Sequence, residues 1–206
     1  MSNKTKNIDF VFVILDEYKD EDVKILNILI NKLLKYDNLG KIYICTSNEI
    51  KVPINTCILH KLKSYQTGDS LLSILRNRNI TNDFILCTKL YNYTNETLDY
   101  IMSNPNTLLL MHKENPNPNI KLDEFNRVKS VDFSSYDNFG YESLGIFRIN
   151  KNMTLTLTIA YHVSFFDENT KTYITSKSRG FDILDLFNHT NWGLFTFDVF
   201  NINGVS

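Results

Sequence analysis

The chain has 206 residues, of which 43% are hydrophobic, and this length suits one domain with a single buried core. Its 22 Lys and Arg residues nearly balance 23 Asp and Glu residues, so the formal net charge is -1. This balance excludes the broad basic surface that binds a nucleic-acid backbone. We therefore expect a single domain spanning residues 1–206 and no direct contact with nucleic acid.

No apolar stretch of the sequence is long enough for a membrane span, and the first apolar run is too short for a secretory signal. The three cysteines, Cys45, Cys57 and Cys87, each lie in or beside an apolar, strand-like run. A buried thiol acts as a small hydrophobe, and disulfides are rare in reducing compartments. The sequence thus predicts a cytosolic protein with reduced cysteines and no membrane contact.

The first half of the chain alternates strand-like and helix-like segments. Residues 10–15 form a continuous apolar run typical of a strand buried on both faces of a parallel sheet. An acidic start at Asp20 then precedes a helical spacing of apolar residues, and we expect Gly40 to end this helix. The alternation continues with strands at 41–45, 57–62, 83–87 and 107–111, and with helices at 67–75 and 98–102. This order predicts an α/β fold of three layers, a mostly parallel mixed sheet flanked by helices.

The second half of the chain has a different pattern. Asn and Pro alternate at 115–119, which supports neither a helix nor a central strand. Strands are expected at 129–132 and 141–149, followed by a short helix at 181–187 and a last strand at 194–200. No repeat or long linker divides the chain, so these segments are expected to form a mixed part of the same sheet.

Acidic residues gather directly after the first strand, at Asp16, Glu17 and 20–22. Open α/β sheets place ligands at this edge, so a metal role is one interpretation. A solvated helix start is the simpler interpretation, because acidic side chains favour the positive end of the helix dipole. The turn at 15–19 also lacks the glycines that let a backbone approach a phosphate closely.

Other patterns that carry chemistry are weak. No Ser lies in a nucleophile elbow, and no Cys has a His nearby in the sequence. The segment 67–70, Thr-Gly-Asp-Ser, could hold a ligand at a helix N-terminus, but Thr67 or Asp69 as an ordinary cap explains it equally well. The four histidines show no short metal-binding spacing, since they lie far apart, at His60, His112, His162 and His189.

Three segments are informative when they are taken together. They are Lys-Ile-Tyr-Ile-Cys-Thr-Ser at 41–47, the pair formed by 67–72 and 80–86, and Ser-Arg-Gly-Phe-Asp-Ile-Leu at 178–184. Together they resemble the nucleotidyltransferase-like domain of the catalytic subunits in the exchange factor for translation initiation factor 2. The pair, with its Gly-Asp helix start and Asp-Phe-Ile-Leu strand, favours the epsilon subunit over gamma. The resemblance runs from about residue 9 to about residue 200.

The resemblance implies a nucleotidyltransferase-like fold, of the GT-A or Rossmann-like kind. Active sugar nucleotidyltransferases of this fold have a Gly-rich, Arg-containing signature after the first strand, and an Asp that holds magnesium after the strand matching 83–87. Here Lys89 lies at the second place, where it adds a positive charge and removes an oxygen ligand. We therefore expect no catalytic residue, metal or cofactor. The expected degenerate pocket contains Asp16, Glu17, Gly68, Asp69 and Lys89.

This resemblance then implies that the chain is not an enzyme. It would be a non-catalytic subunit or domain of the initiation factor 2B complex, which supports guanine-nucleotide exchange by assembly and binding. Its partners would be the other subunits of that complex and initiation factor 2. Epsilon subunits continue into a β-helix and a C-terminal helical-repeat exchange domain, and these 206 residues stop before both. Exchange activity is therefore not expected of these residues.

Two other interpretations stay open. The first is a divergent sugar-phosphate nucleotidyltransferase that uses Asp16, Glu17 and Asp69 in unusual roles. The second is a glycosyltransferase of related topology, which would usually have an Asp-x-Asp metal pair at a strand end. The spacing of that kind in this chain, at 20–22, falls at a predicted helix start.

Overall fold

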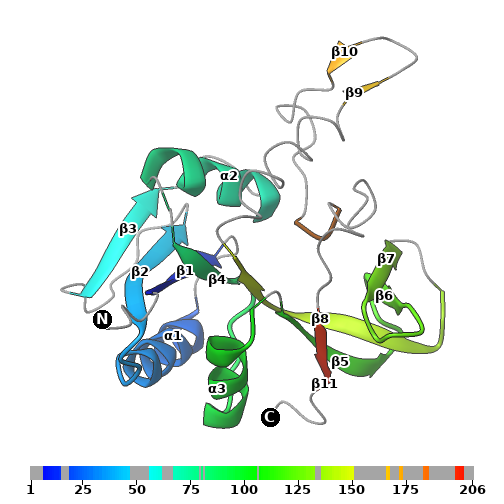
Figure 1. Ribbon diagram of the computed structural model, residues 1–206, viewed down its shortest axis with the longest axis horizontal. Coiled ribbons are helices and arrows are strands. Elements are labelled where there is room, and N and C mark those ends of the chain that lie inside the picture. Colours follow the sequence, from blue (N-terminus) through cyan, green and yellow to red (C-terminus); the bar gives the residue numbers. More distant parts are fainter. Residues whose placement is uncertain are drawn as a thin grey trace, which may run out of the picture.

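A computed structural model of the chain describes seven longer parts, four short ones and the single residue 80. The longer parts are 7–14, 19–46, 56–61, 67–78, 82–105, 107–132 and 136–150. The short ones are 166–167, 172–173, 183–185 and 198–201. Within these residues the main feature is a nine-stranded sheet with the order β11-β5-β8-β4-β1-β2-β3, and β6 and β7 attached beside β8 (Figure 1).

The elements have the following bounds. The strands of the large sheet are β1 (Ile8–Ile14), β2 (Leu39–Thr46), β3 (Cys57–Lys61), β4 (Asp83–Cys87), β5 (Thr107–Glu114), β6 (Asn119–Leu122), β7 (Val128–Asp132), β8 (Phe139–Ile149) and β11 (Asp198–Asn201). A separate pair consists of β9 (Phe166–Asp167) and β10 (Thr172–Tyr173). The helices are α1 (Asp20–Leu33), α2 (Thr67–Arg78), α3 (Asn95–Ser103) and the short 3-10 helix η2 (Ile183–Asp185).

The centre of the sheet is parallel. Strand β1 pairs in parallel with both β2 and β4, and β2 pairs in parallel with β3. All seven residues of β1 are buried, as its continuous apolar run predicts for a strand that is covered on both faces. Strand β8 runs antiparallel to both β4 and β5, which makes the sheet mixed. The predicted fold class, a three-layer α/β fold with a mostly parallel mixed sheet, is confirmed.

Helices cover both faces of this sheet. Helices α1 and α3 lie on one face, where their apolar side chains pack with the alternate strand residues Phe10, Phe12 and Ile44 (Figure 1). Helix α2 lies on the other face (Figure 1). It packs with Val11 and Val13, which alternate with Phe10 and Phe12 along β1. The period-two alternation of a strand thus sends neighbouring residues of β1 to two separate cores. Among the described helices, none is long and apolar enough to cross a membrane.

The prediction that Gly40 ends the first helix is wrong. Helix α1 ends at Leu33, and Gly40 lies in β2. A Cβ atom at Gly40 would come within 2.3 Å of Asp9 Oδ1, the oxygen that accepts a hydrogen bond of 2.8 Å from the Lys41 N–H. The glycine is needed because the buried Asp9 side chain packs directly on the β2 backbone.

Most predicted strands are confirmed, with ends that shift by a few residues. Of the last strand, predicted at 194–200, residues 194–197 lie outside the described residues, and the described part, β11, extends from Asp198 to Asn201. Of the helix predicted at 181–187, the structure describes only the single turn Ile183–Asp185. Strand β6 was not predicted, and it forms a hairpin with β7. The three cysteines are buried and free, as predicted.

Candidate functional site

The order of the strands reverses between β1 and β4. The chain leaves β1 through α1 toward β2 and β3 on one side, and then returns through α2 to β4 on the other side. In open α/β sheets, ligands bind at the carboxyl ends of the strands where such a reversal occurs. The turn after β1, with Asp16 and Glu17, lies outside the described residues. The described side of this candidate site is therefore the turn after β4, which contains Thr88 and Lys89.

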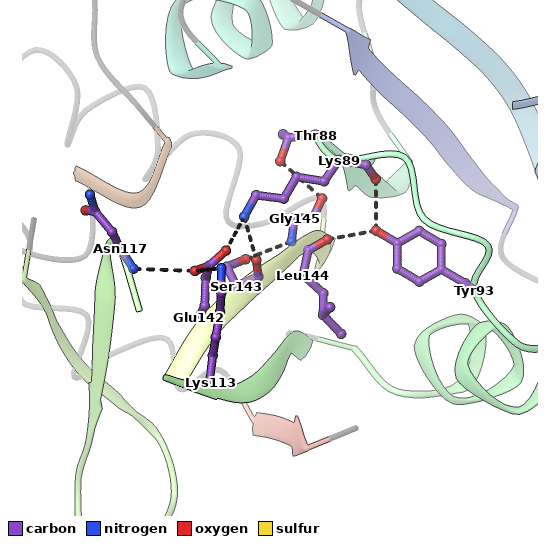
Figure 2. Close-up of polar contacts among 9 residues, drawn as sticks. All are labelled: Thr88, Lys89, Tyr93, Lys113, Asn117, Glu142, Ser143, Leu144 and Gly145. Carbon is purple, nitrogen blue, oxygen red and sulfur yellow. Dashed lines mark hydrogen bonds and ion pairs between the residues drawn. The ribbon is translucent and has the colours of Figure 1, made fainter. Parts of the chain in front are cut away.

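Lys89 forms an ion pair with a carboxylate on the neighbouring strand. Its Nζ donates to Glu142 Oε1 at 3.0 Å and to the Ser143 carbonyl oxygen at 3.1 Å (Figure 2). The other carboxylate oxygen, Oε2, accepts from Lys113 Nζ at 2.8 Å and from the Asn117 N–H at 3.4 Å. The turn after β4, the end of β5 and the start of β8 thus meet at one carboxylate.

The three charged side chains differ in exposure. The Glu142 side chain is only 7% exposed, whereas those of Lys89 and Lys113 are 39% and 45% exposed. Burial opposes ionisation of Glu142, but the hydrogen bonds from Lys113 and Lys89 outweigh it and hold the pKa of Glu142 below its usual value. The hydrogen bond to Glu142 in turn raises the pKa of Lys113. At neutral pH the cluster is therefore one buried anion beneath two solvent-accessible cations.

The lowered pKa of Glu142 predicts that acid weakens the fold at this cluster. A carboxyl group whose pKa is lower in the folded state stabilises it above the unfolded pKa, near 4.5, and loses that contribution as the pH falls through the folded value. We expect the unfolding free energy of the native chain to fall more steeply below pH ~4.5 than that of Glu142→Gln. Urea denaturation between pH 3 and 7 measures both slopes, and equal slopes would contradict the assignment.

Gly145 brings the turn after β4 close to β8. Leu108 of β5 pairs with Phe147, and Leu110 pairs with Ser143, so β8 advances by four residues where β5 advances by two. Within this bulge Gly145 has a φ of +72°, and its carbonyl oxygen accepts from the Thr88 N–H at 2.6 Å. A Cβ atom at Gly145 would lie 2.7 Å from Lys89 Cγ. The absent side chain therefore leaves the space that the Lys89 stem fills.

Tyr93 also holds the turn after β4 in place. Its side chain is buried, and its hydroxyl group lies 2.9 Å from the Lys89 carbonyl oxygen and 2.8 Å from that of Leu144 (Figure 2). Since the hydroxyl group has one proton, the two carbonyl oxygens share it. Burial raises the pKa of Tyr93 well above its usual value, so this proton stays in place at neutral pH.

Two of the three cysteines lie deep in the sheet and are not nucleophiles. Burial raises the pKa of Cys87, which is directly before the turn, to about 12, and it does the same for Cys45 in β2. The Cys87 thiol group donates to the Lys89 carbonyl oxygen at 3.2 Å. Its role at the site is therefore to hold the turn.

The predicted site residues separate into two groups. Lys89 lies in the charged cluster, whereas Gly68 and Asp69 lie in the first turn of α2. Gly68 is buried, and the side chain of Asp69 is outside the described part of the structure. The neighbouring Thr67 hydroxyl group accepts a hydrogen bond of 2.9 Å from the Ile183 N–H, so it anchors η2.

Sequence reasoning missed Glu142 and Lys113. The available signal is Glu142, the single carboxylate in the strand-like segment 141–149. It shares one face of the predicted strand with the apolar residues Leu144 and Ile146, and this face is expected to be buried. Strand β8 is buried from Glu142 to Ile149, and this carboxylate is the acidic residue within that span. A buried charge needs a partner, so its presence indicates that a cation reaches it from another element.

Comparisons with known proteins identify the fold. No family model matches the chain, and no curated protein matches it. Among solved structures, CMP:2-keto-3-deoxy-manno-octonic acid synthetase complexed with CTP has a TM-score of 0.60 at 7% identity, over 97% of this chain and 91% of that one. HddC from Yersinia pseudotuberculosis has a TM-score of 0.55 at 10% identity, over 95% and 90% of the chains. UTP-bound UGPase from Acinetobacter baumannii has a TM-score of 0.52 at 6% identity, over 96% and 87%. The nucleotidyltransferase-like fold is confirmed.

These similarities overturn the prediction that the chain is not an enzyme. The matched structures include a synthetase and a UGPase, which are enzymes, so the fold gives no ground for a non-catalytic assignment. The prediction was wrong because it used two local stretches of sequence. The charged groups at this edge come from three elements: Lys89 follows β4, Lys113 lies on β5 and Glu142 lies on β8. No contiguous sequence motif contains all three residues.

Proposed function

We propose that the chain is a sugar nucleotidyltransferase, which transfers a nucleoside monophosphate from a nucleoside triphosphate to a phosphorylated sugar. An acceptor oxygen attacks the α-phosphorus, the bond from that phosphorus to the bridging oxygen of the β-phosphate breaks, and pyrophosphate leaves. Catalysis of such a transfer consists mainly of positioning phosphates and neutralising their charge. A site for it needs fixed positive charge at an accessible edge.

The observation that supports this function best is the pair of lysines that meet at Glu142. Lys89 follows β4, the strand beside the reversal, and Lys113 lies near the carboxyl end of β5; both side chains are partly exposed. The solved structures with similar folds include one complexed with CTP and one bound to UTP. A triphosphate at this edge would meet cations that the fold already holds in position.

The reaction itself tests this proposal. The purified chain is incubated with each of the four nucleoside triphosphates and a panel of sugar phosphates, with and without magnesium. We expect one combination to yield pyrophosphate and a nucleotide sugar in equal amounts, measured by coupled phosphate assay and by chromatography. The α,β-methylene analogue of the same nucleotide should yield neither product. Failure of every combination to exceed a heat-denatured control would contradict the proposal.

The assignment to the translation initiation exchange factor stays a prediction. Its partners would be the sister subunits and initiation factor 2. Recovery of those proteins with the tagged chain from its own cells would support this assignment, and recovery of the chain without them would contradict it.

A further inference from the structure

The end of β4 does not fit the magnesium that the resemblance implies for active members of this fold. The position after the strand is held by Lys89, whose ammonium group would repel a divalent cation. The carboxylate that contacts Lys89, that of Glu142, accepts from Lys89 on one oxygen and from Lys113 on the other. Across the described residues, no three His, Cys, Asp or Glu side chains gather as metal ligands. Among the described residues, the end of β4 therefore offers a hard cation neither open oxygen ligands nor a favourable charge.

The same cluster is suited to an anion. Two ammonium groups share one carboxylate, so the three side chains together have a net charge of +1 at neutral pH. An ammonium group has three N–H donors. Within the described part of the chain, Lys89 uses two of them, on Glu142 and Ser143, and Lys113 uses one, on Glu142. Donors on both lysines are left for oxygens that arrive from solvent.

The geometry also fixes where these donors are. The buried Glu142 carboxylate lies between the two lysines and contacts both, while Gly145 and Tyr93 hold the backbone of the turn that contains Lys89 (Figure 2). A surface lysine without such supports loses side-chain entropy when it binds a ligand. Here that ordering is already present in the chain without ligand.

We infer that Lys89, together with Lys113, replaces the divalent cation at the end of β4, so that the chain binds the phosphates of a nucleoside triphosphate there without a metal. This inference rests on the proposed function, since it names how that site neutralises its substrate. The alternative is a purely structural ion-pair cluster, in which the lysines only balance Glu142. The two differ in whether Lys89 contributes to nucleotide affinity when magnesium is removed.

Nucleotide binding with and without magnesium tests the inference. Isothermal titration with ATP, CTP, GTP and UTP is carried out in EDTA and again in magnesium. We expect at least one nucleotide to bind in EDTA, and Lys89→Met to weaken that binding about tenfold or more, as expected for loss of a charge-assisted hydrogen bond. Methionine keeps an unbranched stem against Gly145, and Lys113 still contacts Glu142, so circular dichroism should show a native fold, with an unfolding midpoint lowered by the loss of one Glu142 partner.

Lys121→Met is the matched control. Lys121 is also a lysine paired with a carboxylate, Asp137, and its side chain is 42% exposed, but it lies on β6. We expect this variant to change nucleotide affinity less than about twofold, as is usual for an exposed ion pair away from the ligand.

The possible results separate the inference from the proposed function. Binding that needs magnesium and disappears in EDTA would overturn the inference and leave the proposed function standing. Native affinity in a folded Lys89→Met variant would also overturn it. A chain that binds no nucleotide under either condition would contradict both.

Discussion

Replacing Gly145 with Ala is expected to lower the free energy of unfolding by about 2–4 kcal/mol. The φ of +72° alone disfavours any residue with a Cβ atom, by roughly 1–2 kcal/mol. The added Cβ atom would also lie 2.8 Å from Lys89 Cβ and 2.8 Å from Thr88 Oγ1. Since these atoms are close to the backbone, the turn after β4 must move away from β8. The same movement displaces the Lys89 ammonium group, so weaker nucleotide binding should accompany the loss of stability.

Guanidinium denaturation measures this effect, and a second substitution separates its two causes. Asn tolerates a left-handed conformation better than Ala does but is larger. If the steric clash dominates, Gly145→Asn should be no more stable than Gly145→Ala. Ser103→Ala, at an exposed position of α3, is the control and should change stability by less than about 0.5 kcal/mol. A Gly145→Ala variant that unfolds at the native midpoint would show that the bulge tolerates a side chain.

Replacing Arg148 with Met is expected to lower the free energy of unfolding by roughly 3–5 kcal/mol, as when one partner of a buried ion pair is lost. Arg148 is only 6% exposed, and its Nη1 donates to the carbonyl oxygens of Ile101 and Met102 at 3.0 and 2.6 Å. Its Nη2 lies 3.6 Å from Asp83 Oδ2. The guanidinium group thus neutralises the negative end of α3 and links it to the start of β4.

Denaturation of three variants tests this role. Arg148→Lys keeps the charge but loses the fork that reaches two carbonyl oxygens, so its stability should fall between native and Arg148→Met. In the double variant Asp83→Asn with Arg148→Met, the carboxylate that Arg148 neutralises is removed together with the guanidinium group. We expect the double variant to recover part of the lost stability. If Arg148→Met is as stable as the native chain, the buried guanidinium group is not what joins α3 to the sheet.

The sequence predicts the centre of the fold well because the signals there are local. The apolar run at 10–15 is enough to indicate a strand buried on both faces, and β1 is one. The Gly40 prediction failed because the reason for that glycine is distant in sequence: it lies against Asp9 on a neighbouring strand. Strand β6 escaped prediction because it is four residues long and directly follows the Asn-Pro loop.

The candidate site could be predicted only in part. The resemblance identifies Lys89, because it marks the position after this strand, but there it predicts loss of activity. Glu142 and Lys113 were not found, since each is an ordinary charged residue until β5 and β8 place it beside Lys89. Gly145 gives no sequence signal of its own, because its role depends on a bulge that involves three strands. Contacts between distant segments are what the local patterns cannot report.

That a nucleoside triphosphate binds at the carboxyl end of β4 is tested most directly by a crystal structure of the chain with the nucleotide that binds in solution. We expect the phosphate oxygens to lie within hydrogen-bonding distance of Lys89 Nζ, beside the end of β1, with the Lys89–Glu142 contact retained beneath them. A triphosphate bound elsewhere on the chain, with the Lys89 ammonium group touching only Glu142 and Ser143, would contradict it.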